Sequence, residues 1–238
     1  MSERFFTTAA PQDGRAVLTG DEARHLAKVL RAREGDAVVL FDGRGRSWPA
    51  RVTRIGRDTV DLDAEAPQID PAVAGSRLTL VVALPKGDRQ KWMVEKLTEL
   101  GVARLVPLET TRGVAEATDG ARARLERGVI EACKQCGRNT LMEIAPGRRL
   151  DQVLAERDAD ARIVIAHPGG GSLDAAVPAS GTDVIALVGP EGGFTADEVA
   201  AAAAAGAAPV SLGPHILRVE TAAIAVAARL VAAASGRT

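Results

Sequence analysis

The stretch LVGPEGGFT, residues 187–195, lies between the two local patterns that decide the fold of this chain. The short apolar run at residues 184–188 is rich in β-branched residues and predicts a buried strand. Beyond the stretch, Thr195 is followed three residues later by Glu198, a capping-box spacing that is typical of a helix N-terminus. Glycines between a buried strand and a helix let backbone amides approach a ligand closely. The stretch therefore predicts an α/β fold with a binding loop at the end of this strand.

A second stretch, LGPHILRVETA at residues 212–222, repeats the order of strand, glycine-bearing loop and helix. It follows a predicted strand at 210–212 and precedes a predicted helix at 221–234. We expect the two loops to follow neighbouring strands and to form one pocket. The glycines do not have G-x-G-x-x-G spacing, and the chain contains no G-x-x-x-x-G-K-[ST], so neither a dinucleotide site nor a triphosphate site is indicated.

Outward from these loops, apolar runs and amphipathic segments alternate along the chain after residue 70. This alternation is typical of a mostly parallel sheet covered by helices on both faces. The further predicted elements are strands at 78–84, 103–107 and 163–166, and helices at 88–100, 119–136 and from 195 onward.

The pattern before residue 70 is different. Thr19 and Glu22 have capping-box spacing and predict a helix that runs to Arg31. Short alternating runs separated by glycine-bearing turns predict a small β-barrel-like module with strands at 37–41, 47–55 and 59–64. We therefore predict one domain at residues 1–70 and a second at 71–238, joined by a linker at 67–75.

The composition narrows the class of protein. The 238 residues include 30 Lys and Arg against 31 Asp and Glu, and two cysteines, which excludes fibrous, disulfide-scaffolded and strongly acidic classes. The run 199–217 lacks Asp, Glu, Lys and Arg, but it is mostly alanine and is interrupted by glycine and proline, so no membrane span is predicted. The chain start has no apolar export signal, and the cysteine usage suits a reducing compartment, so we expect a cytoplasmic protein.

Two local features leave alternatives open. Nine basic residues face three acidic ones between Arg24 and Arg57, which fits a phosphate-bearing partner or a solvated β domain. Cys133 and Cys136 have C-x-x-C spacing, but there is no second pair and the histidines are scattered. Reduced thiols on a buried helix face are thus favoured over a metal or redox site. The apolar residues of the helix predicted at 88–100 favour packing in the core or at a dimer interface over stacking on RNA bases.

Over nearly the whole chain, these features resemble the RsmE-type 16S rRNA (uracil-N3)-methyltransferases of the SPOUT superfamily. The motifs that carry the resemblance are RFF at 4–6, His25 with VLR at 29–31, KGDR at 86–89, Lys96 with TELGV at 98–102, PL at 107–108 with TR at 111–112, EA at 131–132 with QCGR at 135–138, GPEGG at 189–193, and the stretch at 212–222.

The resemblance implies a fold and an activity. The fold would be a small PUA-like RNA-binding β-barrel followed by a SPOUT-type α/β domain, with a parallel sheet and a C-terminal trefoil knot. The enzyme would use S-adenosylmethionine, without a metal, to methylate N3 of a specific uridine in 16S rRNA of the small ribosomal subunit. It would be a homodimer whose interface completes the active site.

The resemblance also implies roles for individual residues. Cofactor contacts are expected from His167, Leu187, Val188, Gly189, Pro190, Glu191, Gly192, Gly193, Leu212, Gly213, His215, Ile216, Leu217 and Arg218. Arg218, Glu220 and Glu191 are the catalytic candidates, since removing the N3 proton favours a carboxylate and the developing anion favours a cation. The candidate RNA contacts are Arg4, Arg31, Arg89, Arg112 and Arg138.

Two positions depart from the family pattern, because His215 and Val219 stand where the family usually has Arg and Thr. Two other interpretations stay open, and these departures favour the first of them. One is an RNA-binding ribosome-assembly factor with a residual cofactor pocket and no turnover. The other is an α/β enzyme that binds a different nucleotide-like cofactor in the same pocket.

Overall fold

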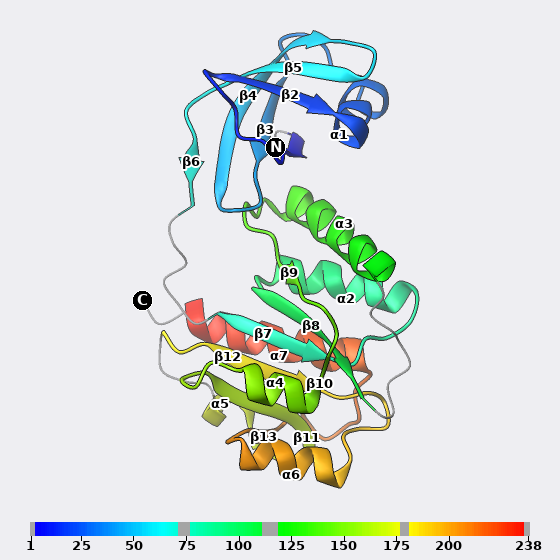
Figure 1. Cartoon of the computed structure of the whole chain (residues 1–238), viewed down its shortest axis with the longest axis vertical. Coiled ribbons are helices and arrows are strands. Elements are labelled where there is room, and N and C mark those ends of the chain that lie inside the picture. The colour runs from blue at the N-terminus through cyan, green and yellow to red at the C-terminus, as the bar shows by residue number, and fades with distance from the viewer. Residues whose placement is uncertain (1–2, 71–76, 111–118, 177–180, 236–238) are drawn as a thin grey trace. The chain divides into compact units, whose positions relative to one another are not determined.

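The computed structural model describes residues 3–70, 77–110, 119–176 and 181–235, and the chain divides into two compact units (Figure 1). Unit 1 contains Met1–Val73 and Ile130–Leu141, and unit 2 contains Ala74–Val129 and Met142–Thr238. Unit 1 thus includes a segment, 130–141, that the boundary expected near residue 70 left in the second domain.

Unit 1 is built on one sheet with the strand order β1-β3-β4-β5-β2, and β6 pairs with β4. Among the described strands only the β1–β3 pair is parallel. Alternating side chains such as Phe5, Leu40 and Leu62 fill a core on one side of the sheet. The predicted strands are confirmed at β3, β4 and β5, whereas β1 and β2 were not predicted. The strands are β1 (Glu3–Phe6), β2 (Arg15–Thr19), β3 (Ala37–Phe41), β4 (Arg46–Ile55), β5 (Thr59–Ala64) and β6 (Gln68–Ile69).

The helical segment after β2 is shorter and less regular than predicted. It consists of α1 (Gly20–Arg24) and a π-helical segment, η1 (His25–Val29). The predicted capping box is wrong, because the Thr19 side chain makes no cap hydrogen bond. Thr19 is the last residue of β2, and Gly20 has a φ of +60°. The chain therefore enters the helix through a left-handed residue, which replaces the usual Ser/Thr cap geometry.

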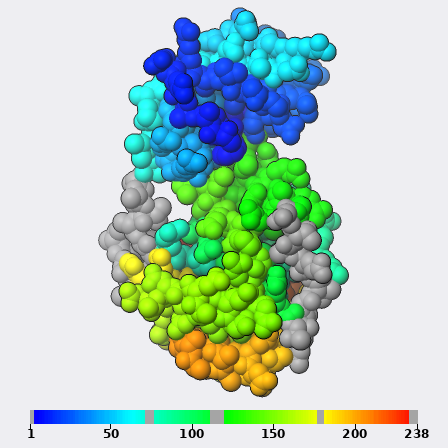
Figure 2. Space-filling view, in the orientation of Figure 1, coloured from blue at the N-terminus to red at the C-terminus, as the bar shows by residue number. Residues whose placement is uncertain are grey.

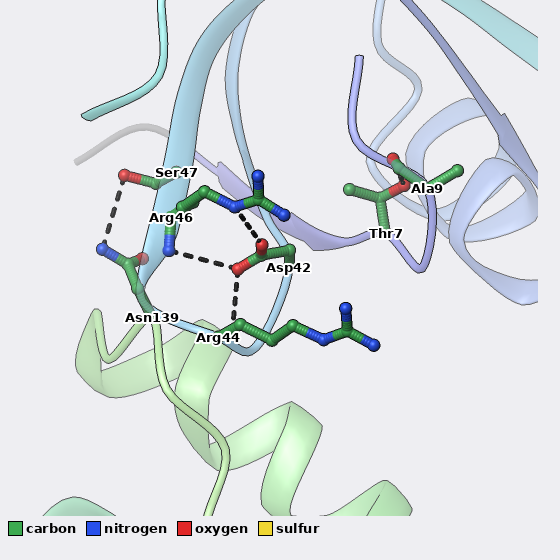
Figure 3. A network of polar contacts seen from close by, with 7 residues as sticks. All are labelled: Thr7, Ala9, Asp42, Arg44, Arg46, Ser47 and Asn139. Atoms are coloured by element: carbon green, nitrogen blue, oxygen red, sulfur yellow. Dashed lines mark hydrogen bonds and ion pairs between the residues drawn. The ribbon is translucent and has the colours of Figure 1, made fainter. Parts of the chain in front are cut away.

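Hydrogen bonds attach the segment 130–141 to the rest of unit 1. The Asn139 Nδ2 atom donates to Ser47 Oγ at 3.4 Å, shown in Figure 3, and to Asp70 Oδ1 at 2.7 Å. The backbone N–H of Leu141 donates to the Gly43 carbonyl at 2.9 Å. Asn139 is 8% exposed, and its buried amide finds partners in two parts of the chain at once.

A buried carboxylate organises the turn between β3 and β4 (Figure 3). Asp42 accepts from the backbone N–H groups of Arg44 and Arg46 at 2.8 and 3.1 Å, and from Arg46 Nε at 2.7 Å. Burial acts to raise the pKa of Asp42, but these hydrogen bonds outweigh it and lower the pKa below its usual range.

Unit 2 contains a sheet with the order β10-β8-β7-β12-β11-β13, and β9 pairs with β8. Every pair among its described strands is parallel, which confirms the predicted α/β fold. The strands are β7 (Leu78–Val82), β8 (Arg104–Glu109), β9 (Glu143–Ile144), β10 (Arg148–Arg149), β11 (Arg162–Ser172), β12 (Val184–Val188) and β13 (Ala208–Ser211). The helices outside unit 1 are α2 (Asp88–Glu99), α4 (Leu150–Glu156), α5 (Leu173–Ala176), α6 (Ala196–Ala204) and α7 (Val219–Ser235), while α3 (Asp119–Cys136) begins in unit 2 and ends in unit 1.

Helices pack on both sides of this sheet. On one side, α4 and α6 contact each other, and α6 (orange) lies beside α4 (yellow-green) in Figure 2. Residues such as Leu154 and Ala202 from these helices share a core with Val81, Ile165 and Leu187 of the strands. On the other side, α7 packs against β7, β12 and α2 (Figure 1). The loops after β11, β12 and β13 are left to form the site.

Candidate functional site

A cleft of about 370 Å³ lies at the carboxyl ends of β11, β12 and β13. Parallel sheets bind ligands at this edge, and the volume is in the range of small-molecule sites. The two loops predicted from the sequence do meet, but their strands are not neighbours, because β11 lies between β12 and β13. The end of β11 therefore supplies a third wall. The lining residues are Ala166, His167, Pro168, Val188, Gly189, Pro190, Glu191, Gly193, Phe194, Leu212, Gly213, Pro214, His215, Ile216, Leu217, Val219 and Ala222.

The loop after β12 is folded tightly upon itself. A Cβ at Gly189 would lie 3.0 Å from two atoms of the Phe194 ring, so glycine allows the ring to pack against the backbone. Gly193 has a φ of +68°, and its N–H donates to the Pro190 carbonyl at 2.8 Å. The capping box predicted at Thr195 is present and opens α6. These contacts hold the loop in one conformation at the cleft.

The end of β11 bends toward the cleft. Its pairing with β13 shifts register between Ala166 and Gly171, as at a β-bulge. A Cβ at Gly170 would lie 2.4 Å from the backbone nitrogen of Val210, so only glycine fits this crossing. The Nδ1 atom of His167 accepts from the Gly169 N–H at 3.1 Å. The neutral His167 ring consequently carries its proton on Nε2.

The loop after β13 forms the remaining wall. The Ser211 hydroxyl oxygen accepts from the Gly213 N–H at 3.3 Å, and Gly213 has a φ of +124°. Ile216 is 91% exposed although it lines the cleft, so its apolar side chain is available to a bound molecule. Val219 and Ala222, one helical turn apart on α7, complete the apolar surface.

A group of three charged side chains lies next to the cleft. The Arg89 Nη1 atom, from the start of α2, lies 3.7 Å from Glu191 Oε1 and 3.8 Å from Glu220 Oε2. Glu191 lines the cleft, whereas Glu220 is 5% exposed. Within the described structure, Glu220 Oε2 makes no hydrogen bond. With two carboxylates and one guanidinium, this charged trio has a net negative charge, and the Glu220 Oε2 atom is left free to accept a hydrogen bond.

The cofactor residues predicted from the sequence are brought together with three exceptions. Leu187 is fully buried in the core beneath the loop, and Gly192 and Arg218 do not line the cleft. Arg218 is exposed at the residue before α7. Sequence reasoning missed Phe194, although it falls within the 187–195 stretch, and Ala222, which helical spacing from Val219 would have indicated. The other lining residues outside the predicted set are Ala166, Pro168, Pro214 and Val219.

Most of the arginines predicted to contact RNA are engaged within the protein. Arg4 donates to Asn139 Oδ1 and lies 5.1 Å from the centre of the Phe41 ring, and burial lowers the pKa of Arg4. Burial also lowers the pKa of Arg138, which is half-buried. Arg89 belongs to the charged trio. Arg31 is exposed, and Arg112 lies outside the described residues.

In the part of the chain that the structure describes, neither the cysteines nor other side chains gather into a metal cluster. Within residues 3–70, 77–110, 119–176 and 181–235, no three His, Cys, Asp or Glu residues are grouped to hold an ion. Cys133 is buried and burial raises its pKa to about 11, whereas Cys136 is exposed, so only one thiol fits the buried face predicted for both. No helix in the described part of the chain has the length and apolarity to cross a membrane.

Comparisons with known proteins agree with both units. An RNA methyltransferase domain family matches residues 74–231, and an RNA methyltransferase PUA domain family matches residues 18–65. The Ribosomal RNA small subunit methyltransferase E of Mycobacterium bovis is 34% identical over 235 residues, covering 92% of this chain and 87% of the relative. The enzyme of the same name from Bacillus subtilis is 28% identical over 217 residues, covering 86% and 85%.

A solved structure gives the same result. The Neisseria gonorrhoeae Ribosomal RNA small subunit methyltransferase E, bound to S-adenosyl methionine, superposes with a TM-score of 0.92 at 29% identity over 100% of both chains. The family resemblance seen in the sequence is confirmed. This chain belongs to the RNA methyltransferase family that includes Ribosomal RNA small subunit methyltransferase E.

Proposed function

We propose that this enzyme binds S-adenosylmethionine in the three-loop cleft and methylates N3 of a specific uridine in 16S rRNA of the small ribosomal subunit. One observation carries the proposal. The 189–194 loop, the end of β11 and the 212–217 loop all line one cleft, and the charged trio of Arg89, Glu191 and Glu220 lies beside it. The S-adenosyl methionine bound by the Neisseria gonorrhoeae relative supports this choice of cofactor.

The cleft suits this cofactor in size and in chemistry. Its volume of about 370 Å³ accommodates a nucleoside-sized molecule, and its walls combine glycine backbone with apolar side chains. Gly189 and Gly193 line the cleft without a side chain, so a ligand can approach the backbone closely there, and Ile216 offers an apolar surface. S-adenosylmethionine supplies a methyl group on a positively charged sulfonium. The Glu191 carboxylate on the cleft wall favours a cation there.

The chain itself supplies a proton acceptor and a cation. Glu220 accepts the N3 proton, because its buried Oε2 atom has no hydrogen-bond partner within the described structure. Arg89 holds Glu220 and Glu191 in place through the two ion pairs. Arg218, exposed beside α7, stabilises the negative charge that develops on the uracil. The target uracil must leave any base stack in the RNA before its N3 can reach the site.

The remaining family expectations belong to the same proposal. The segments around the 189–193 and 212–218 loops form the trefoil knot, and two copies of the chain complete the active site at their interface. The PUA-like unit contacts RNA, and the enzyme works in the cytoplasm on ribosomal particles. The match of the RNA methyltransferase PUA domain family to residues 18–65 supports the role of the first unit.

The decisive experiment is methyl transfer from labelled S-adenosylmethionine to small subunits isolated from cells that lack this protein. Reverse transcription then maps the modified base, because methylation on its pairing edge stops the polymerase. We expect label in 16S rRNA and one new stop at a uridine. Cofactor binding without label would instead favour the RNA-binding assembly factor. Gly189→Trp, which places a large side chain at a residue that lines the cleft, is expected to abolish S-adenosylmethionine binding.

A further inference from the structure

The exposed cations of unit 1 are not all the ones that the sequence predicts to contact RNA. Arg4 and Arg138, predicted to contact RNA, are partly buried and engaged within the unit. By contrast, Lys28 and Arg57 are exposed, and neither side chain has a hydrogen bond or ion pair within the described residues. Cations that are exposed and unpaired are the ones that an anionic partner meets first.

Lys28 and Arg57 lie on the same small cleft of unit 1. The cleft has a volume of about 80 Å³ and separates the helical segment α1–η1 from the turn between β4 and β5. Arg24 is the third cation on its rim, and its ion pair with Asp21 at 3.0 Å is exposed and thus easily exchanged. The one acidic residue of the lining is Asp58. The lining residues are Gly20, Ala23, Arg24, Ala27, Lys28, Gly56, Arg57, Asp58 and Thr59.

The backbone around this cleft is irregular in a way that function explains better than packing. Lys28 belongs to the π-helical segment η1, and such segments occur frequently at functional sites. Arg31, two residues after η1, has a φ of +54°, which is unfavourable for a residue with a side chain. Val29 nevertheless stays 67% exposed, so the irregular geometry does not serve to bury it.

We infer that this cleft binds a backbone phosphate of RNA through Lys28 and Arg57, with Arg24 as a third contact. The cleft, at about 80 Å³, is about the size of one small anion, and three of its nine lining residues are cations. The inference rests on the proposed function only in taking RNA as the partner. It assigns the contact to residues outside those expected from the family motifs.

The test is the salt dependence of binding between the full chain and a 16S rRNA transcript, measured by filter binding. Each lost phosphate contact is expected to reduce the slope of log K against log salt by about 0.7 to 0.9. Lys28→Gln and Arg57→Gln should each weaken binding several-fold and reduce the slope, and the double variant should reduce it by about twice as much. Lys28→Arg keeps the charge and should retain the slope.

Arg15→Gln is the matched control. It removes one positive charge from β2 of the same unit. In the β2–β5 ladder, Arg15 lies opposite Asp63 at one end, whereas the Thr19–Thr59 pair beside the cleft is at the other end. The inference is overturned if the double variant and Arg15→Gln lower the slope equally. It is also overturned if the double variant loses binding to polyglutamate, a mimic of acidic proteins, while its RNA slope is unchanged.

Calorimetry with S-adenosylmethionine separates this inference from the proposed function. The cleft variants lie in unit 1 and should bind the cofactor as tightly as the native chain. If no uridine is methylated but the slope still falls, the methylation proposal fails and the phosphate cleft stands. If methylation occurs and the slope is unchanged in the cleft variants, the methylation proposal stands and the phosphate cleft fails.

Discussion

The guanidinium of Arg89 lies 3.8 Å from the carboxylate of Glu220, which comes from a helix more than a hundred residues further along the chain. Glu220 is 5% exposed, and its Oε2 atom makes no hydrogen bond within the described structure. A buried carboxylate oxygen without a donor calls for an explanation, and under the proposed function the uracil N3–H is the donor that reaches it. The same arginine reaches Glu191 on the cleft wall.

Glu220→Gln keeps the shape of the side chain and removes its charge. We expect kcat for methyl transfer to fall by about 10² to 10⁴, the usual contribution of a general base, with S-adenosylmethionine affinity changed little. Arg89→Lys should retain more activity than Arg89→Met, since lysine keeps one positive charge. Glu156→Gln, at an exposed position of α4, is the control. A native kcat in Glu220→Gln would exclude this residue as the base.

Gly170 and Gly171 are adjacent, but only one of them is crowded. A Cβ at Gly170 would lie 2.4 Å from the backbone of Val210, while a Cβ at Gly171 meets nothing within 4 Å. Gly170→Ala should therefore reduce the free energy of unfolding by about 1 to 3 kcal/mol and weaken cofactor binding, because β13 must move. Urea unfolding and calorimetry measure both effects. Equal stability of the two alanine variants would contradict the observed crossing of β11 and β13.

Cys133 and Cys136 should differ in reactivity in the folded protein. Burial raises the pKa of Cys133 to about 11, so its reactive thiolate is scarce at pH 8, while Cys136 is exposed. Brief treatment with iodoacetamide, followed by peptide mass spectrometry, should find Cys136 alkylated and Cys133 unmodified. Both should react in urea. Stability from the neutral Cys133 thiol is present below the unfolded pKa and lost as pH rises through about 11.

Asp42 should make unit 1 sensitive to acid. Its pKa is lowered in the fold, so its stabilisation is present above the unfolded pKa, about 3.9, and is lost as pH falls through the folded pKa. Asp42→Asn should reduce the free energy of unfolding by about 1 to 3 kcal/mol at pH 7, since charged hydrogen bonds are lost. Urea unfolding should show this difference shrinking at pH 3. Asp21→Asn, whose side chain is 94% exposed, should show little change at either pH.

The elements that depend on neighbouring residues could be predicted from the sequence alone. Residues 184–188 form β12, and the Thr195 capping box opens α6, because the apolar run and the cap act within one turn or strand. The helix predicted at 119–136 has the observed bounds of α3. The same local logic failed at Thr19, where the end of β2 and the positive φ of Gly20 determine how the chain enters α1.

The site itself depended on the tertiary structure. The sequence by itself determined the two glycine-bearing loops and the family, whereas β11 lying between β12 and β13 brought His167 to the cleft. Likewise, only the fold placed Arg89 beside Glu220 and attached Asn139 to unit 1. Local patterns encode hydrogen bonds and burial within a few residues, while strand order and buried polar pairs are decided by contacts between residues that are far apart in sequence.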